Sequence, residues 1–205
     1  MKILRIVLNL SGAIVLLLGC TNPFSVRNAE PPEITSDSEF YSDATHPDTV
    51  FSNFKKSIEN RNVPAYMNVF VSNVFSEPHS FHYEPEQYFQ NDFIQKWTRE
   101  DEQNYFSRLK NAGSSDYPRL KLLFMNNLEL RPLVSGSDND SLQTNSLQYQ
   151  LKVDFGDSLI TYGGVADFKL FKSQNNQLWY IYYWRDNAIN KEYLATWTYL
   201  KTRYK

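Results

Sequence analysis

The residue types that could do chemistry are densest at His79 and His82, with Glu77 and Glu84 close by. Imidazole and carboxylate groups are ligands for zinc and other divalent ions. However, the His-x-x-His spacing is common by chance, prolines flank the segment, and no third histidine lies near it in sequence. We therefore interpret the segment as a solvated loop and predict no metal site.

Nucleophilic and nucleotide-dependent chemistry find little support in the sequence. Its single cysteine is Cys20, so no disulfide can form within the chain. There is no glycine-rich phosphate loop and no Gly-x-Ser-x-Gly motif. No cofactor is predicted.

The N-terminal segment 1–19 has the parts of a signal peptide: basic Lys2 and Arg5, then an apolar stretch of 13 residues at 6–18. That stretch is shorter than the roughly 20 residues that span a bilayer. The residues Leu17-Leu18-Gly19-Cys20 resemble the lipobox of bacterial lipoproteins, although Leu18 replaces the commoner small residue. The resemblance implies diacylglyceryl transfer to the Cys20 sulfur and cleavage before it. The alternative is an ordinary signal peptide with an incidental cysteine.

Residues 20–45 are predicted to form a lipid-anchored flexible tether, because they are rich in Pro, Ser, Asn, Asp and Glu and lack apolar periodicity. A coil of about 25 residues reaches roughly 25–30 Å. We therefore expect an exported protein of the bacterial cell envelope, attached to a membrane by the lipid on Cys20.

The charge balance argues against two kinds of partner. The chain has 21 basic and 23 acidic side chains, a net charge of −2, and loss of Lys2 and Arg5 with the signal peptide would leave 19 against 23, or −4. Nucleic-acid binding needs clustered Lys and Arg, so it is not expected. The mild acidity also disfavours electrostatic attachment to anionic lipid.

The remaining residues, 46–205, suit one folded domain, since the chain is 41% hydrophobic and 16% aromatic. Its first half is predicted to be helical. Two Thr-x-x-Asp capping boxes, at 45–48 and 98–101, mark helix starts. The first helix begins near Pro47, a short second one begins at Pro64, and the third ends at Gly113. A short strand and a loop are expected between them, in 71–92.

From residue 120 onward the apolar period changes from 3.6 to 2, which predicts antiparallel strands. The candidates are 120–130, 149–155, 165–172 and 178–186, with a bend at Gly163-Gly164 and a last short turn at 197–200 capping the sheet edge. Simple alternation in 178–186 would place Trp179, Ile181, Tyr183 and Arg185 on one face and Tyr180, Tyr182, Trp184 and Asp186 on the other. Helices followed by about four strands predict an α+β fold with N-terminal helices packed on one sheet face.

This element order, with the segments 48–54, 97–102, 179–186 and 197–201, resembles bacterial lipoproteins whose domain has the cystatin-like α+β cone fold of nuclear transport factor 2 and ketosteroid isomerase. The resemblance covers roughly residues 46–205. It implies a curved antiparallel sheet wrapped on the helices around a conical cavity, but it implies no activity.

Enzymes of this cone fold use a carboxylate or histidine as the base and a tyrosine or protonated acid to hold the oxyanion. Three aspartates on strands could serve as the base: Asp154, Asp167 and Asp186. Their candidate partners are Tyr66, Tyr83, Tyr182 and Arg185, although no residue matches a family catalytic motif. The bland alternative for Arg185 is an ion pair with Asp167 on the neighbouring strand.

We therefore predict a non-enzymatic, membrane-tethered binding or assembly domain with an aromatic cavity and no assigned catalytic residue. Its partner would be a small apolar ligand or a segment of an envelope protein, contacted by Tyr83, Trp97, Tyr182, Trp184 and Arg185. Homodimerisation through the outer sheet face is a third expectation. The alternative function is a small cofactor-independent isomerase, dehydratase or hydrolase of the ketosteroid-isomerase type.

Overall fold

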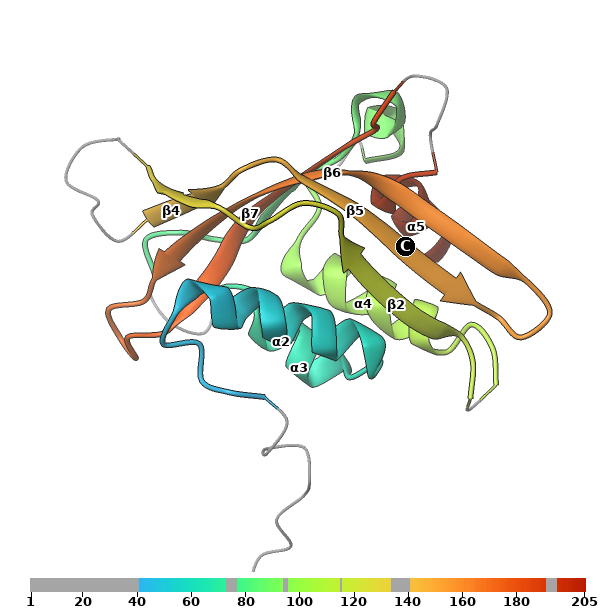
Figure 1. Ribbon diagram of the computed structural model, residues 1–205, viewed down its shortest axis with the longest axis horizontal. Coiled ribbons are helices and arrows are strands. Elements are labelled where there is room, and N and C mark those ends of the chain that lie inside the picture. Colours follow the sequence, from blue (N-terminus) through green and yellow to red (C-terminus); the bar gives the residue numbers. More distant parts are fainter. Residues whose placement is uncertain (1–40, 73–76, 94–95, 115, 134–140, 191–194) are drawn as a thin grey trace, which may run out of the picture. The chain divides into compact units, whose positions relative to one another are not determined.

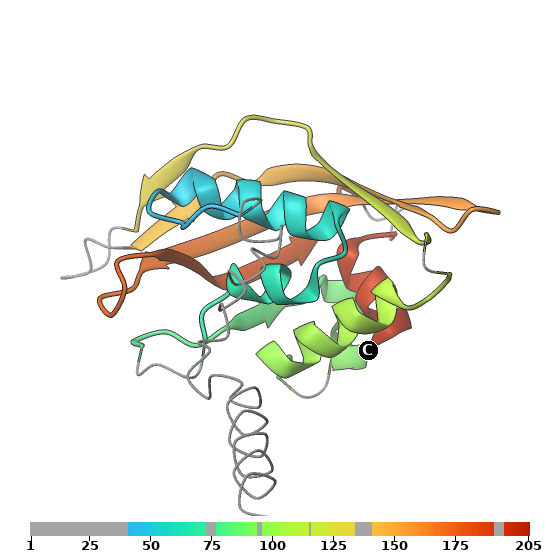
Figure 2. The ribbon, with the colours of Figure 1, turned by 90° about the horizontal axis from the view of Figure 1, so that it is seen from below.

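A curved sheet with helices on one side of it forms the folded part of the chain (Figures 1 and 2). The computed structural model describes residues 41–72, 77–93, 96–114, 116–133, 141–190 and 195–205, all of which belong to one compact unit. The predicted signal peptide, Cys20 and most of the predicted tether lie outside the described residues. Within those ranges, no helix is long and apolar enough to cross a membrane.

The first two helices form the predicted hairpin. Helix α2, Pro47–Glu59, buries an apolar stripe that includes Phe51 and Phe54, and α3, Val63–Asn68, follows it. The predicted capping box at 45–48 is wrong, because His46 is the N-cap residue and its side chain makes no capping hydrogen bond. The start of α3 is capped by Asn62, whose side chain accepts from the Ala65 amide.

The third helix, α4, spans Arg99–Lys110 and begins at the predicted box. Asp101 N–H donates to the Thr98 hydroxyl, and the Asp101 carboxylate accepts from the Thr98 amide, so two otherwise unpaired amides are satisfied. Between α3 and α4 lie a three-residue strand, β1 (His82–Glu84), and a 3₁₀ helix, η1 (Gln87–Phe93).

The sheet has seven strands within the described ranges, rather than about four. In addition to β1 they are β2 (Arg119–Phe124), β3 (Leu130–Pro132), β4 (Ser141–Thr144), β5 (Leu147–Asp154), β6 (Leu159–Lys172) and β7 (Trp179–Asn187). β6 pairs antiparallel with β5 over its first half and with β4 over its second half. β2 pairs antiparallel with β5, and β3 pairs antiparallel with β4. β7 lies between β6, to which it is antiparallel, and β1, to which it is parallel.

Asparagine side chains explain why the predicted strand 120–130 is divided. Asn126 accepts from the Gln148 amide and donates to the Ser146 carbonyl, and Asn145 accepts from the Glu129 amide. Hydrogen bonds of these side chains take the place of backbone hydrogen bonds of the sheet at two connections, from β2 to β3 and from β4 to β5. The sheet therefore bends there without leaving its backbone groups unpaired.

The predicted bend at Gly163-Gly164 is wrong, since both glycines lie inside β6. Gly164 pairs with Tyr149 of β5. A Cβ atom on Gly164 would lie 2.6 Å from the Asn187 carbonyl oxygen and 2.7 Å from the Tyr149 hydroxyl. The glycine thus permits a close approach of Tyr149 and β7 rather than a turn.

The predicted face assignment for β7 is also wrong. The pairing register with β6 shifts between Lys169, opposite Tyr183, and Leu170, opposite Ile181. This bulge places an extra residue in β7, so the alternation changes phase. Ile181, Trp184 and Asp186 are the fully buried residues of the strand, whereas Tyr182 is half-buried and Arg185 is exposed.

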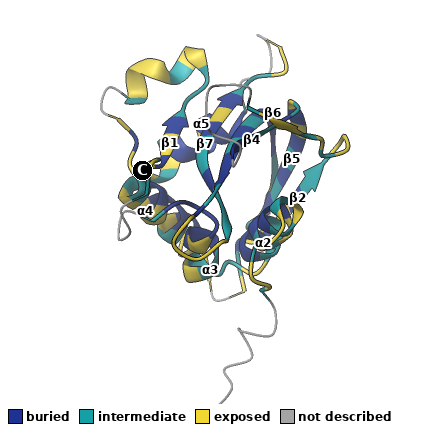
Figure 3. Cartoon of the chain, turned by 90° about the vertical axis from the view of Figure 1, so that its left-hand side faces the viewer, coloured by how far each residue is buried: buried dark blue, intermediate teal, exposed yellow. Residues whose placement is uncertain are grey.

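The predicted final turn at 197–200 is a helix, α5 (Trp197–Tyr204), with the Thr196 side chain as its N-cap. Four of its residues are buried: Trp197, Thr198, Leu200 and Lys201. Figure 3 shows the buried residues gathered between the helices and the sheet, while exposed residues predominate on the outer surfaces of the helices. The interior beside α5 is where polar and charged groups collect.

Candidate functional site

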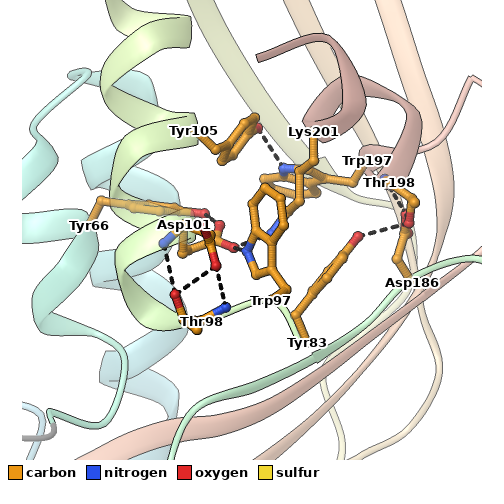
Figure 4. A network of polar contacts seen from close by, with 11 residues as sticks. Tyr66, Tyr83, Trp97, Thr98, Asp101, Tyr105, Asp186, Trp197, Thr198 and Lys201 are labelled. Carbon is orange, nitrogen blue, oxygen red and sulfur yellow. Dashed lines mark hydrogen bonds and ion pairs between the residues drawn. The ribbon is translucent and has the colours of Figure 1, made fainter. Parts of the chain in front are cut away.

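The candidate site is a buried polar network between α4, α5, β1 and β7 (Figure 4). At its centre the Lys201 ammonium forms an ion pair with the Glu102 carboxylate, and both side chains are 0% exposed. Tyr66 O–H donates to one Glu102 oxygen, and Trp97 Nε1–H donates to the other at 2.7 Å. The carboxylate therefore has partners on both oxygens, as a buried charge requires.

Both charged residues reach the interior because they lie on the apolar faces of their helices. Glu102 precedes Tyr105 by three positions and Phe106 by four, so all three share the buried face of α4. Lys201 follows Trp197 by four positions on α5 and shares its buried face. The network thus uses positions that the helical pattern reserves for apolar side chains.

Burial changes the protonation behaviour of the lysine. Loss of water around the ammonium lowers the Lys201 pKa to about 8, and the attraction of Glu102 opposes this change. Because the folded pKa lies below the usual value near 10.4, the folded chain releases this proton before the unfolded chain does. This group's contribution to the free energy of unfolding therefore rises with pH from about 8 to 10.

A second set of hydrogen bonds, around Asp186, provides partners for the backbone amides at the buried start of α5. One Asp186 oxygen accepts from Tyr149 O–H at 2.7 Å, and the other accepts from the Thr198 amide at 2.6 Å and the Thr198 hydroxyl at 2.7 Å. The Tyr149 oxygen in turn accepts from the Trp197 amide at 2.6 Å. These contacts supply acceptors to the first free amides of the helix, and the carboxylate lies at the positive end of its dipole.

Burial raises the pKa of Asp186, while its hydrogen bonds with Thr198 and Tyr149 oppose that change. Burial is also the largest cause that raises the pKa of four tyrosines well above the ordinary value: Tyr66, Tyr83, Tyr105 and Tyr149. Their hydroxyls stay protonated near neutral pH and act as hydrogen-bond donors.

The structure brings three of the predicted ligand-binding residues together. Tyr83, Trp97 and Trp184 are 2%, 6% and 0% exposed, and the Tyr83 ring lies 6.1 Å from Trp97 and 5.2 Å from Trp184. All three surround Lys201 rather than an open cavity. Their contact with a ligand stays a prediction.

The other two predicted residues lie elsewhere. Tyr182 stacks on His79 at 4.1 Å, while Arg185 pairs with Asp167 at 2.7 Å, which confirms the expected ion pair. The His79–His82 segment contributes rings to the sheet surface, with His82 stacked on Tyr183. Within the described ranges, no group of three or more His, Cys, Asp or Glu side chains could hold a metal.

The three candidate bases also differ in position. Asp154 accepts from the Gly156 amide at a strand end, and Asp167 pairs with Arg185, so only Asp186 of the three is fully buried. A surface pocket of about 260 Å³ is lined by Arg61, Lys110, Asn111, Gly113 and Ser114, none of which is a predicted site residue.

Sequence reasoning missed Glu102 and Lys201. Their positions within buried helical stripes were the available signal, since a charged residue three or four positions from buried aromatics needs a partner. Composition and local motifs do not show that the two stripes face each other across 99 residues of sequence.

No protein-family profile and no curated protein sequence matches this chain. Many solved structures are similar to this chain in fold, and two of them are described here. The "putative dehydratase from the NTF2-like family" of Streptomyces avermitilis has a TM-score of 0.52 at 9% identity, with 76% of this chain and 99% of that chain covered. The "putative calcium/calmodulin dependent protein kinase II association domain" of Xanthomonas campestris has a TM-score of 0.50 at 15% identity, with 74% and 97% covered.

At these identities the likeness shows the fold alone. It confirms the predicted α+β fold with helices on a curved, mainly antiparallel sheet, of the type found in nuclear transport factor 2. It carries no activity over to this chain.

The buried pair generates a stability prediction. We expect Glu102→Gln and Lys201→Met each to lower the free energy of unfolding by about 3–5 kcal/mol, because each leaves one buried charge without its partner. In the double variant both groups are neutral. The loss in its free energy of unfolding should be smaller than the sum of the two single losses by at least about 2 kcal/mol. Urea unfolding at pH 7 measures all four proteins.

The exposed pair of Glu129 and Arg131, whose side chains are 59% and 67% exposed, provides the control. Its corresponding cycle, Glu129→Gln and Arg131→Met, should give a coupling below about 1 kcal/mol. Additive losses at Glu102 and Lys201 would show that the two groups do not depend on each other.

Proposed function

We propose that the chain is an exported, lipid-anchored protein of the bacterial envelope whose folded domain binds another envelope protein and does not catalyse a reaction. The observation that supports the non-enzymatic part is the burial of the polar groups beside α5. Trp184, Trp197 and the Glu102–Lys201 pair are 0–1% exposed, and they occupy the space between helices and sheet. A substrate has no access to these groups in this conformation.

The alternative, a small isomerase, dehydratase or hydrolase, has its best support in the contact between Asp186 and Tyr149. A carboxylate beside a tyrosine hydroxyl is the pairing that such chemistry uses. Here, however, both Asp186 oxygens are engaged by the chain itself, and the side chain is 0% exposed. This geometry favours a structural role in holding α5.

With the interior filled, the aromatic surface available to a partner lies outside. Tyr88 on η1 is 69% exposed, its ring lies 5.2 Å from Phe89, and Phe89 lies 5.6 Å from Tyr199 of α5, which is 36% exposed. We call these three residues the Tyr88 patch. The η1 helix contains no fully buried residue, and its last residue, Phe93, packs against the core, whereas Tyr88 remains exposed.

Exposed tyrosines that adjoin one another are a recurrent feature of protein–protein interfaces, because each supplies apolar area together with a hydroxyl. The Tyr88 patch therefore supports binding of a protein segment beside the domain. A second copy of this chain is the homodimeric form of the same proposal.

The membrane attachment rests on the sequence Leu17-Leu18-Gly19-Cys20 and on the polar segment that follows it. A lipid on Cys20 would restrict the domain to within a few tens of ångströms of the membrane. That restriction raises the effective concentration of the Tyr88 patch toward envelope partners.

We expect Cys20→Ser to abolish lipid attachment, because the substitution removes the only thiol in the sequence that could accept a lipid. Cells fed an alkyne fatty acid should label the unaltered chain and leave the variant unlabelled. Serine is nearly isosteric with cysteine, so export itself should continue. Labelling of the variant at the level of the unaltered chain would contradict the lipid anchor.

A photo-crosslinking amino acid at Tyr88 should yield a discrete larger species in cells, because the patch faces the partner. The same amino acid at Gln174, an exposed residue of the β6–β7 hairpin, is the matched control and should yield none. A species of twice the chain mass would identify the homodimeric form. Absence of any species from Tyr88 would overturn the proposed binding surface.

A further inference from the structure

The Lys201 ammonium lies inside a cage of aromatic rings. Its nitrogen is 3.8 Å from the centroid of Tyr83, 4.0 Å from Trp184, 5.2 Å from Tyr105 and 5.4 Å from Trp97. All four distances fall within the roughly 6 Å over which a ring attracts a cation. Figure 4 shows the lysine side chain reaching from α5 toward Tyr83, Trp97 and Tyr105.

None of the four rings of the cage belongs to α5, the helix that carries Lys201. Tyr83 belongs to β1, Trp184 to β7, Tyr105 to α4, and Trp97 to the segment just before α4. Glu102, also on α4, adds a negative charge and accepts the lysine hydrogen bond, and Asp186 on β7 attracts the ammonium as well. Rings around one carboxylate form the arrangement by which proteins bind ammonium ligands.

Trp184 gives independent support for a cation site. Its indole N–H is buried, and it has no hydrogen-bond partner among the described residues. An unsatisfied buried donor is unfavourable, and a phenylalanine would avoid it. Tryptophan is, however, the ring that attracts a cation most strongly, so its presence here is explained by the ammonium over its face.

Helix α5 is held in place by contacts that do not involve Lys201. Asp186 bonds to Thr198, Tyr149 accepts from the Trp197 amide, and Trp197 Nε1–H donates to Tyr105 at 2.9 Å. Loss of the Lys201 side chain should therefore empty the cage and leave its walls standing.

We propose that the aromatic cage around Glu102 is a binding site for primary ammonium groups, and that Lys201 is its resident ligand, supplied by the chain on α5. The site accepts an external amine when the lysine side chain is withdrawn or absent. This inference concerns the interior of the domain and is independent of the membrane anchor and the Tyr88 patch.

The test is binding of n-propylammonium to the full chain carrying Lys201→Ala. That substitution removes three carbons and one nitrogen, and n-propylammonium has the same heavy atoms. At a concentration ten times its dissociation constant, n-propylammonium should raise the Tm of the variant by about 3–5 °C. The unaltered chain should show no shift, because its own lysine fills the cage.

Three comparisons separate a cation site from a simple void. At pH 7 and equal ionic strength, 1-propanol should raise the Tm less than n-propylammonium does. The variant Glu102→Gln/Lys201→Ala should lose the preference for the cation. Lys205→Ala, which removes an exposed lysine next to α5, should not respond to either compound.

If Lys201→Ala does not fold alone, n-propylammonium in the refolding buffer should restore folding and 1-propanol should not. Equal responses to the two compounds, no response to either, or failure to refold with the cation present would each overturn the proposal.

Discussion

The ion pair between Glu102 and Lys201 is the constraint on which the interior depends. Two charges that are 0% exposed are stable only together and only with further hydrogen bonds, which Tyr66 and Trp97 donate. Because one charge comes from α4 and the other from α5, the pair adds to the contacts of Trp197 and Thr198 that hold the C-terminal helix against the domain. The aromatic rings around it then close the space between helices and sheet.

The burial of this network bears directly on the question of function. The similar fold in other proteins leaves both binding and catalysis open, since a fold alone specifies neither. In this chain, Asp186 is positioned as a candidate base, but it instead accepts hydrogen bonds at the start of α5. Asp186 is thus engaged in holding the structure, while Tyr88 is exposed on the surface.

Local signals in the sequence predicted much of the fold. The helix start at Thr98, the apolar stripe of the first helix and the alternation in β5 depend on neighbours within a few residues, and the structure has all three. The bulge in β7 could not be predicted in this way, because it reflects pairing with β6 rather than the residues of β7 alone. The role of Gly164 could not be predicted for the same reason, since a glycine is required there by the close approach of Tyr149 and Asn187, which lie on other strands.

The candidate site was predicted only in part. The aromatic residues Tyr83, Trp97 and Trp184 do meet, but they meet around Lys201, whose partner no local pattern identifies. The contact between Glu102 and Lys201 joins residues 99 positions apart. Such a pair becomes visible only when the two buried helix faces are known to meet.

The titration of Lys201, followed by nuclear magnetic resonance of its side-chain nitrogen, tests the central claim most directly. We expect one lysine to titrate with a pKa of about 8, and its signal to be absent from Lys201→Met. Its ammonium protons should exchange slowly with water because they are buried. If every lysine titrates near the ordinary pKa of about 10.4, Lys201 is solvated and the interior is not closed as described.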